Sequence, residues 1–168
     1  GLGDVYKRQP YYNSFHKVYT GTFDIKTDVA LTVFKEPDME RLREKFLKAD
    51  AIYVGGGDTV FMIEHWKKTG LLPLLEDAYE RGVVLAGLSA GAICWFSDIY
   101  TDSLKAEDGT RYAMFKGLNW IKGIISPHYG QRVLDFDKIV CYNYECAYGI
   151  EDNAAPVSYT HLTLPTIA

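Results

Sequence analysis

The chain has 168 residues, of which 48% are hydrophobic, 14% aromatic and 24% charged, and its formal net charge is -4. This apolar content suffices for one hydrophobic core and not for two. The mild negative charge, without a stripe of Lys and Arg, argues against a nucleic-acid partner, and no apolar run approaches the roughly 18 residues of a membrane span.

The three cysteines, Cys94, Cys141 and Cys146, form no C-x-x-C pair. An odd number of cysteines without paired spacing favours reduced thiols over a disulfide framework. We therefore expect a cytoplasmic protein in which each cysteine is a buried small hydrophobic residue.

The two ends of the chain, residues 1–9 and 157–168, differ in character from the rest. Residues 4–9 and 157–162 can be back-translated into DNA stretches that are reverse complements over most of their length, as two copies of a transposon-based sequencing adapter are. The first segment also lacks the apolar run of a signal peptide. We expect both ends to be adapter-derived and to take no part in the sheet core, and residues 10–155 to be one incomplete α/β domain, truncated at both ends.

From residue 28 onward the sequence alternates between strand and helix patterns. Residues 28–34 are predicted to form a strand, and Asp38 is predicted to cap a helix with apolar residues on one face. A short apolar strand at residues 51–54 runs directly into three glycines.

Two helices are predicted next, at about residues 59–68 and 71–81. Gly70 and Gly82 follow them, and glycine tolerates the left-handed conformation that ends many helices. Residues 83–86 are apolar at every position, which is typical of a parallel strand covered on both faces.

A further helix is predicted to begin near Ala90, followed by a strand at residues 123–126 and a helix at about residues 133–142. Strands that alternate with helices predict an α/β protein with a doubly wound, mostly parallel sheet. In such sheets ligands bind at the carboxyl ends of the strands.

The strongest chemical signal is the sequence G-L-S-A-G at residues 87–91, directly after a predicted strand and before a predicted helix. In this context the pattern G-x-S-x-G is typical of a nucleophile elbow, a sharp turn that exposes the hydroxyl of Ser89. The helix behind the serine directs free N–H groups at a developing oxyanion. The alternative is a glycine-rich turn with an incidental serine.

A nucleophilic serine needs a base, and the chain has four histidines. His161 lies in the expected adapter segment, His16 in a polar segment near the start, and His65 within a predicted helix. His128 follows a predicted parallel strand, so it would share a sheet edge with Ser89 and could reach its hydroxyl. The alternative for His128 is a structural role.

The sequence G-G-G-D-T at residues 55–59 also follows a predicted strand. Three glycines allow the backbone to approach a ligand closely and to present N–H groups, which suits a phosphate or an oxyanion. The segment matches neither the dinucleotide-binding pattern nor the P-loop, so nucleotide binding is the weaker interpretation. Asp58 or Thr59 is the expected N-cap of the following helix.

Four ordered stretches of the sequence resemble motifs of the dipeptidase E and cyanophycinase family of serine peptidases. They are V-G-G-G-D-T at residues 54–59, A-G-L-S-A-G-A at 86–92, P-H-Y at 127–129 and G-I-E-D-N-A-A at 149–155. The resemblance implies a fold like that of class I glutamine amidotransferases and hydrolysis of small peptides, in some members with an aspartyl residue at the amino end. Cofactors and metals are not expected.

The resemblance also implies roles for particular residues. Ser89 corresponds to the nucleophile, His128 to the base, and the backbone N–H groups of Gly57 and Ala90 to the oxyanion hole. Asp152 corresponds to the acid of a Ser-His-acid triad.

The choice of acid has alternatives. Glu151 stands beside Asp152 in the same motif, and a pair of neighbouring carboxylates is often only a solvated turn. A different arrangement proposed for relatives places the acid shortly after the nucleophile, which corresponds here to Asp98 or Asp102. Arg111, Lys122 and Arg132 are candidate partners for an acidic substrate.

Rival functions differ in class. An α/β-hydrolase esterase shares G-x-S-x-G, but its triad runs Ser, acid, His along the chain, whereas the order here is Ser89, His128, Asp152. A non-enzymatic module would bind a small ligand without turnover. A glutamine amidotransferase is disfavoured because position 89 is serine and Cys94 lies further along the predicted helix.

Overall fold

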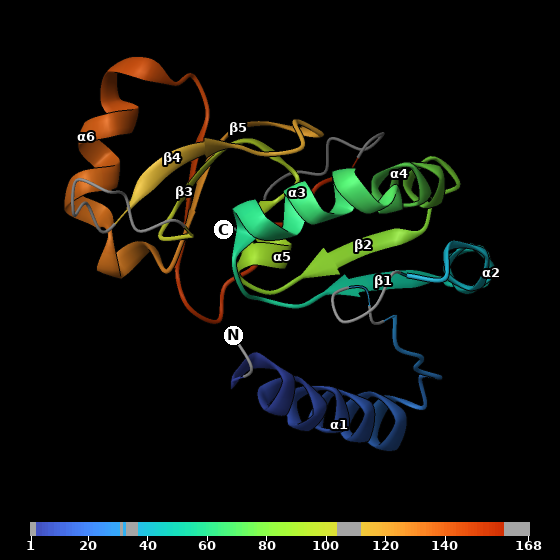
Figure 1. The fold of residues 1–168 in the computed structure, drawn as a ribbon. Helices are drawn as coiled ribbons and strands as arrows, with labels where there is room; N and C mark the ends of the chain where they lie inside the picture. The colour runs from blue at the N-terminus through green and yellow to red at the C-terminus, as the bar shows by residue number, and fades with distance from the viewer. Residues whose placement is uncertain (1–2, 31, 33–36, 104–111, 160–168) are drawn as a thin grey trace. The chain divides into compact units, whose positions relative to one another are not determined.

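The computed structural model describes the backbone and side chains of most of the chain, namely residues 11–30, 32, 37–103 and 112–159, together with the backbone of residues 3–10. Two compact units are found, Gly1–Ala49 and Asp50–Ala168. In Figure 1 the first unit carries the blue helix α1 and the cyan helix α2, and the second carries every labelled strand.

The first unit contains helix α1 (Gly3–Phe23) and helix α2 (Met39–Leu47). The predicted cap of α2 is confirmed, because the Asp38 side chain accepts a hydrogen bond from the Arg41 N–H at 3.0 Å. Leu42 and Phe46, one turn apart, are the buried residues of this helix, as expected for an amphipathic pattern.

The strand predicted at residues 28–34 is wrong for the residues that the structure describes. Residues 28–30 and 32 lie in no strand, and the others fall outside the described residues. Lys45 binds this segment instead: its Nζ donates to the carbonyl of Val29 at 2.6 Å and to Oδ1 of Asp28 at 2.8 Å. This ammonium group lowers the pKa of the Asp28 carboxyl. A backbone carbonyl of this segment therefore accepts a hydrogen bond from a lysine side chain rather than from a neighbouring strand.

The second unit opens with a parallel pair of strands, β1 (Ala51–Val54) and β2 (Val84–Gly87). Helices α3 (Thr59–Thr69) and α4 (Leu71–Glu80) connect them and lie along one side of the pair (Figure 1). Gly70, at φ +76°, ends α3 in the left-handed conformation, as predicted. Both strands and both helices lie where the sequence predicts them, to within two residues at each end.

Strand β2 departs from the prediction in its burial. A strand that is apolar at every position was expected to be covered on both faces, but exposed and half-buried residues alternate along β2, and Val84 is 61% exposed. The expectation that every position is covered is therefore wrong for this strand.

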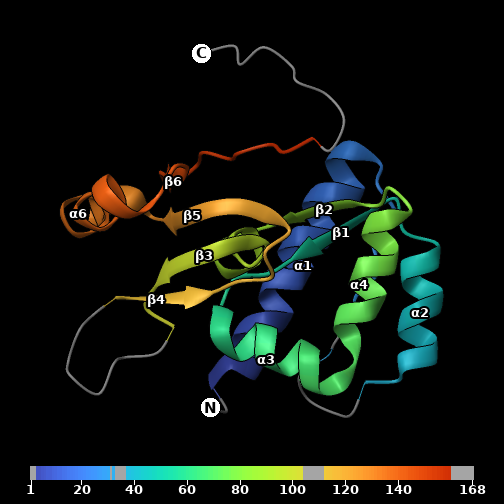
Figure 2. The same ribbon diagram turned by 90° about the horizontal axis from the view of Figure 1, so that it is seen from above.

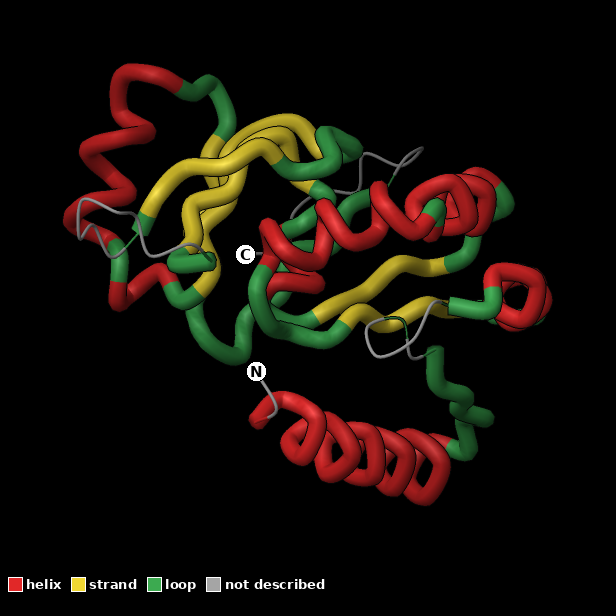
Figure 3. The backbone as a smooth tube through the Cα atoms, in the orientation of Figure 1, coloured by secondary structure: helices red, strands yellow, loops and turns green. Residues whose placement is uncertain are grey.

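The second sheet has the strand order β4-β3-β5-β6, and Figure 3 shows it apart from the β1–β2 pair. Neighbouring strands are parallel except β4, which runs antiparallel to β3, as the arrowheads in Figure 2 show. The predicted α/β class with mostly parallel strands is confirmed. The strands are β3 (Phe96–Thr101), β4 (Ala113–Lys116), β5 (Ile121–Pro127) and β6 (Ala147–Ile150).

The helix predicted near Ala90 is short: α5 spans Ala90–Ile93, and β3 begins three residues later. Residues 117–121 account for this ending. The Cys94 carbonyl accepts the N–H of Leu118 at 2.8 Å, and the Trp95 carbonyl accepts the N–H of Trp120 at 2.8 Å. These carbonyls bond to a distant segment rather than to a further helical turn.

Beyond β5 the chain forms a short 3₁₀ turn, η1 (Tyr129–Gln131), and helix α6 (Val133–Asn143), which the sequence predicts. Phe136 of α6 packs into a core cluster with Tyr100 and Ile124 of the sheet. Tyr129, in the turn that follows β5, packs against this cluster.

Four aromatic rings form a stack in the second unit. Trp120 stacks on Tyr79 with ring centroids 5.3 Å apart and on Trp95 at 5.2 Å, and Trp95 lies 6.0 Å from Trp66. Trp66 and Trp95 are buried, so the stack connects the α3–α4 layer with the start of the second sheet.

Candidate active site

Ser89 lies between the end of β2 and the start of α5, with φ 51° and ψ -113°. Residues other than glycine rarely adopt a positive φ, and such conformations concentrate at functional sites. The strained turn agrees with the nucleophile elbow that the sequence predicts.

The two glycines of the G-x-S-x-G pattern are required by close backbone contacts. A Cβ on Gly87 would lie 2.2 Å from the carbonyl oxygen of Gly91, and a Cβ on Gly91 would lie 2.2 Å from that of Val54. The end of β1 therefore packs directly on the turn that carries Ser89, without room for a side chain.

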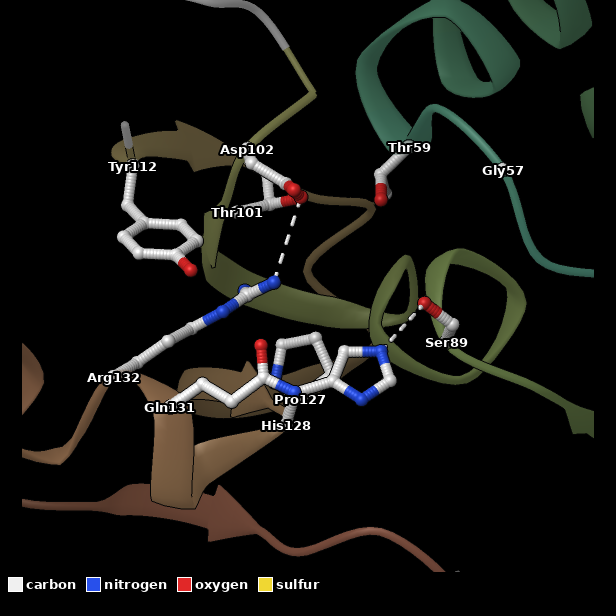
Figure 4. Close-up of a pocket in the computed structure, with 10 residues that line it drawn as sticks. All are labelled: Gly57, Thr59, Ser89, Thr101, Asp102, Tyr112, Pro127, His128, Gln131 and Arg132. Atoms are coloured by element: carbon white, nitrogen blue, oxygen red, sulfur yellow. Dashed lines mark hydrogen bonds and ion pairs between the residues drawn. The ribbon is translucent and has the colours of Figure 1, made fainter. Parts of the chain in front are cut away.

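His128 follows β5 in the left-handed conformation, at φ 52° and ψ 46°. Its Nε2 lies 3.4 Å from Oγ of Ser89, at the long end of the hydrogen-bond range (Figure 4). Catalytic hydrogen bonds are often long when no substrate is bound. The structure thus brings Ser89 and His128 to the same edge, as the sequence predicts.

Asp152 lies on the other side of the His128 ring, with its Oδ1 2.5 Å from Nδ1 of His128. The parallel register explains this proximity, because Pro127 at the end of β5 is opposite Ile150 at the end of β6. Both strands therefore deliver their next residues to one edge of the sheet.

The turn that carries His128 packs against strand β6 through Tyr129. The Tyr129 ring occupies the space where a Cβ on Gly149 would lie, at 2.5 Å from the nearest ring carbon. The Tyr129 hydroxyl donates to Oδ1 of Asp137 at 2.9 Å, and this hydrogen bond raises the pKa of Tyr129.

The other candidate acids bind elsewhere. Glu151 accepts a hydrogen bond from the Gly130 N–H at 3.1 Å, so it holds the turn after His128 rather than the imidazole. Asp98 pairs with Lys116 at 2.6 Å, and this contact raises the pKa of Lys116.

Asp102, the last candidate acid, is paired with Arg132 and not with the imidazole of His128. Its Oδ1 is 3.4 Å from Nη2 of Arg132.

The two predicted oxyanion-hole residues, Gly57 and Ala90, both lie near Ser89. Ala90 follows it directly and is buried, and Gly57 lines the same pocket as Ser89, at φ +145°. Within the described part of the chain, no hydrogen bond from either backbone N–H is found. Whether these N–H groups form an oxyanion hole stays a prediction.

Ser89 and His128 open into a pocket of about 360 Å³ (Figure 4). This volume lies at the small end of the range for ligand sites. Its remaining walls come from four parts of the chain: the start of α3, the end of β3, the residue before β4, and the end of β5 with the turn that follows it. These residues are Thr59, Thr101, Asp102, Tyr112, Pro127, Gln131 and Arg132.

The sequence did not predict this wall as a unit. Thr59 was expected only as a possible helix cap, a role that Asp58 fills by accepting the Phe61 N–H at 2.9 Å. Tyr112 and Gln131 stand in no motif, and their position depends on tertiary packing. The sequence could have indicated only that a pocket would form near the carboxyl ends of the strands.

Of the candidate partners for an acidic substrate, Arg132 lines the pocket. Lys122 binds the side chain of Asn119 at 2.9 Å, and Arg111 falls outside the described residues.

Cys94 is fully buried, as expected, and this burial raises the pKa of its thiol. The expected burial is wrong for Cys141 and Cys146, which are exposed. Cys94 is not among the residues that line the pocket. Among the residues that the structure describes, no group of three or more His, Cys, Asp or Glu side chains is placed to hold a metal ion. No helix in the described ranges has the length and apolar character to cross a membrane.

Comparison with known proteins identifies relatives along most of the chain. The family model described as Peptidase family S51 matches residues 3–158. The uncharacterized peptidase YgaJ of Bacillus subtilis (strain 168) is 36% identical over 129 residues, which cover 74% of this chain and 54% of that protein. Peptidase E of Shewanella baltica (strain OS185) is 25% identical over 145 residues, which cover 77% of this chain and 57% of that protein.

A solved structure is also similar. The 1.5 Å crystal structure of a putative peptidase E protein from Listeria monocytogenes EGD-e matches with a TM-score of 0.43 and 25% sequence identity, over 60% of this chain and 50% of that one. The chain spans about half the length of the curated relatives it matches.

The family match includes the serine turn and the segments that follow β5 and β6, which the structure brings to one edge. The family resemblance predicted from the sequence motifs is thereby confirmed. The chain belongs to peptidase family S51.

Proposed function

We propose that the chain carries the active site of a serine peptidase that hydrolyses small peptides. The observation that carries this proposal is that His128 contacts both other residues, one through each ring nitrogen. Its Nε2 lies 3.4 Å from Oγ of Ser89, and its Nδ1 lies 2.5 Å from Oδ1 of Asp152. A nucleophile, a base and a carboxylate in this order form the constellation of serine hydrolases on unrelated folds.

In the proposed mechanism, Nε2 of His128 removes the hydroxyl proton of Ser89 as Oγ attacks the carbonyl carbon of the scissile peptide bond. The resulting imidazolium is stabilised by Asp152, which also holds the proton on Nδ1 so that Nε2 is free to act as base. His128 then gives the proton to the leaving amine, and the C–N bond breaks. In the second half of the reaction, His128 takes a proton from water as the water oxygen attacks the acyl-enzyme. His128 then returns the proton to Oγ of Ser89 as the ester bond breaks.

The tetrahedral intermediate carries a negative oxygen, which needs donors that are already in place. The backbone N–H groups of Gly57 and Ala90 are proposed for this role. Oxyanion donors are commonly worth about 2.7–4 kcal/mol in the activation free energy, because they require no reorganisation during the reaction.

The proposed substrates are short peptides, with an aspartyl residue at the amino end as one candidate. The pocket of about 360 Å³ supports a small substrate. The similarity to proteins named Peptidase E also supports this class.

A serine-directed fluorophosphonate probe tests the nucleophile. We expect labelling of the purified protein at Ser89, loss of labelling in Ser89→Ala, and unchanged labelling in Ser14→Ala, which alters an exposed serine of α1. Failure to label Ser89 would support a binding module without turnover. Hydrolysis of aspartyl-alanine or alanyl-alanine, compared with p-nitrophenyl acetate, separates a peptidase from an esterase.

A further inference from the structure

The ion pair between Asp102 and Arg132 lies in the same pocket as Ser89 and His128 (Figure 4). Its two members differ in accessibility: the Arg132 side chain is 5% exposed, whereas that of Asp102 is 59% exposed. The charge that a ligand can reach is therefore negative.

Arg132 is already held by other groups. Its Nη1 donates to the carbonyl of Tyr100 at 2.8 Å, and its guanidinium lies over the ring of Tyr112, 4.5 Å from the centroid. These contacts fix an arginine more firmly than a single surface ion pair would. Arg132 thus orients Asp102 through Oδ1 and leaves the second carboxylate oxygen for another donor.

Thr59 contributes a second polar group without a partner. Its side chain is 1% exposed, and its hydroxyl has no hydrogen-bond partner among the described residues. Figure 4 shows this hydroxyl directed into the space between Ser89 and Asp102. A buried hydroxyl without a partner carries a free-energy cost that a ligand can remove.

The position of Thr59 is fixed by its backbone. Its N–H donates to Oγ of Ser103 at 2.9 Å, and that hydroxyl contacts the hydroxyl of Thr101 at 3.1 Å. The start of α3 is thereby tied to the segment that ends β3, and Thr59 is held in the pocket that Asp102 also lines.

An exposed carboxylate and an unpartnered hydroxyl suit an ammonium group, which has a positive charge and three N–H donors. In a peptide cleaved after its first residue, the free α-amino group is separated from the scissile carbonyl carbon by only one atom. A group that binds this amine beside Ser89 would select peptides with a free amino end.

We propose that Asp102 binds the free α-amino group of the substrate, with the hydroxyl of Thr59 as a second acceptor. This inference rests on the proposed peptidase function, and it makes the enzyme one that removes single residues from the amino end. It also assigns Asp102 a binding role in place of the triad acid considered from the sequence.

Binding measurements test this proposal without turnover. In Ser89→Ala, aspartyl-alanine and alanyl-alanine are titrated calorimetrically, each with a free and with an N-acetylated amino end. We expect at least one free dipeptide to bind about 10- to 100-fold more tightly than its acetylated form, as for hydrogen bonds to a charged group. Asp102→Asn added to this background should bring the ratio close to one.

Asp77→Asn is the matched control, because Asp77 is a half-exposed aspartate paired with Arg81 on α4, away from the pocket. It should leave the ratio unchanged. With Asp102 intact, raising the pH through about 8, the ordinary pKa of an α-amino group, should also remove the preference for the free dipeptide. This measurement needs no substitution at Asp102, so it is decisive even if Asp102→Asn unfolds.

The proposal is overturned if free and acetylated dipeptides bind equally, if neither free dipeptide binds, or if the preference survives in a folded Asp102→Asn protein. Failure of the peptidase function has a different signature, which is the absence of fluorophosphonate labelling at Ser89. The two results are obtained from separate measurements and can be told apart.

Discussion

At the scale of single residues, backbone contacts decide where the Ser89 hydroxyl lies. The carbonyl of Val54 accepts the N–H of Leu88 at 3.0 Å and also lies against Gly91. A strained φ at one residue costs of the order of 1–3 kcal/mol and persists only where surrounding contacts hold it. At the elbow, those contacts come from the backbone of Val54, Gly87 and Gly91.

The close approach at Gly91 predicts a loss of stability in Gly91→Ala. The added Cβ would lie 2.2 Å from the Val54 oxygen, so backbone must move, and we expect a destabilisation of about 1–3 kcal/mol or more with loss of Ser89 labelling. Gly21→Ala, in α1 with open space around the site, should instead stabilise its helix by about 0.5–1 kcal/mol. Urea unfolding followed by circular dichroism measures both. Equal effects at the two sites would contradict the backbone-contact account.

The assignment of the acid predicts different kinetics for two aspartates. Asp152→Asn keeps the shape of the side chain but removes the charge beside Nδ1 of His128, and kcat should fall by up to about four orders of magnitude. Asp102→Asn should mainly raise KM for peptides with a free amino end, because its proposed role is in binding. Steady-state kinetics on both variants, with thermal melts to confirm folding, provide the measurement.

The opposite pattern would reverse the roles of these aspartates. A near-parental kcat in Asp152→Asn together with a collapse of kcat in Asp102→Asn would place the acid in the segment after β3. If kcat changes little in both variants, Ser89 and His128 act as a dyad.

At the scale of elements, the start of α3 matters because Gly57 and Thr59 flank its cap. Asp58→Ala removes the side-chain bond to the Phe61 N–H and should cost about 1 kcal/mol of stability, with slower labelling of Ser89. Asp38→Ala removes the equivalent cap of α2 and should cost a similar amount without affecting the labelling rate. Comparable labelling rates in the two variants would argue against a link between this cap and the site.

The helices could be predicted from the sequence because their signals are local. Asp38, Asp58 and Gly70 act within a few residues of themselves, and the structure confirms each. Strand β3 was missed because the apolar run before it resembles a continuing helix, which only the distant residues 117–121 interrupt. Strands β4 and β6 are four residues each and depend on neighbours far away in the sequence.

The candidate site shows the same division. Ser89 and His128 follow strands and could be located from the local pattern, while Asp152 came from the family motif and its place beside His128 depends on the β5–β6 register. The pocket wall of Thr59, Tyr112 and neighbouring residues could not be predicted, because it assembles from four separate segments.

At the scale of the whole molecule, the prediction for the ends of the chain can be tested by deletion. Val157 is 71% exposed and Tyr159 is 57% exposed, so neither belongs to a core. Removing residues 157–168 should change the free energy of unfolding by no more than about 0.5 kcal/mol, the range of substitutions away from packed features. A loss of about 2 kcal/mol or more, in urea unfolding of the shortened and complete chains, would show that this segment is part of the fold.

The aromatic stack gives the molecule an optical probe of its own. All three tryptophans of the chain, Trp66, Trp95 and Trp120, belong to this stack and to the unit that carries Ser89, while Gly1–Ala49 contains none. Tryptophan emission therefore reports the unfolding of one unit alone, whereas far-ultraviolet circular dichroism reports the helices of both. Coincident transitions in the two signals would indicate one cooperative molecule, and separated transitions would yield the stability of each unit from unmodified protein.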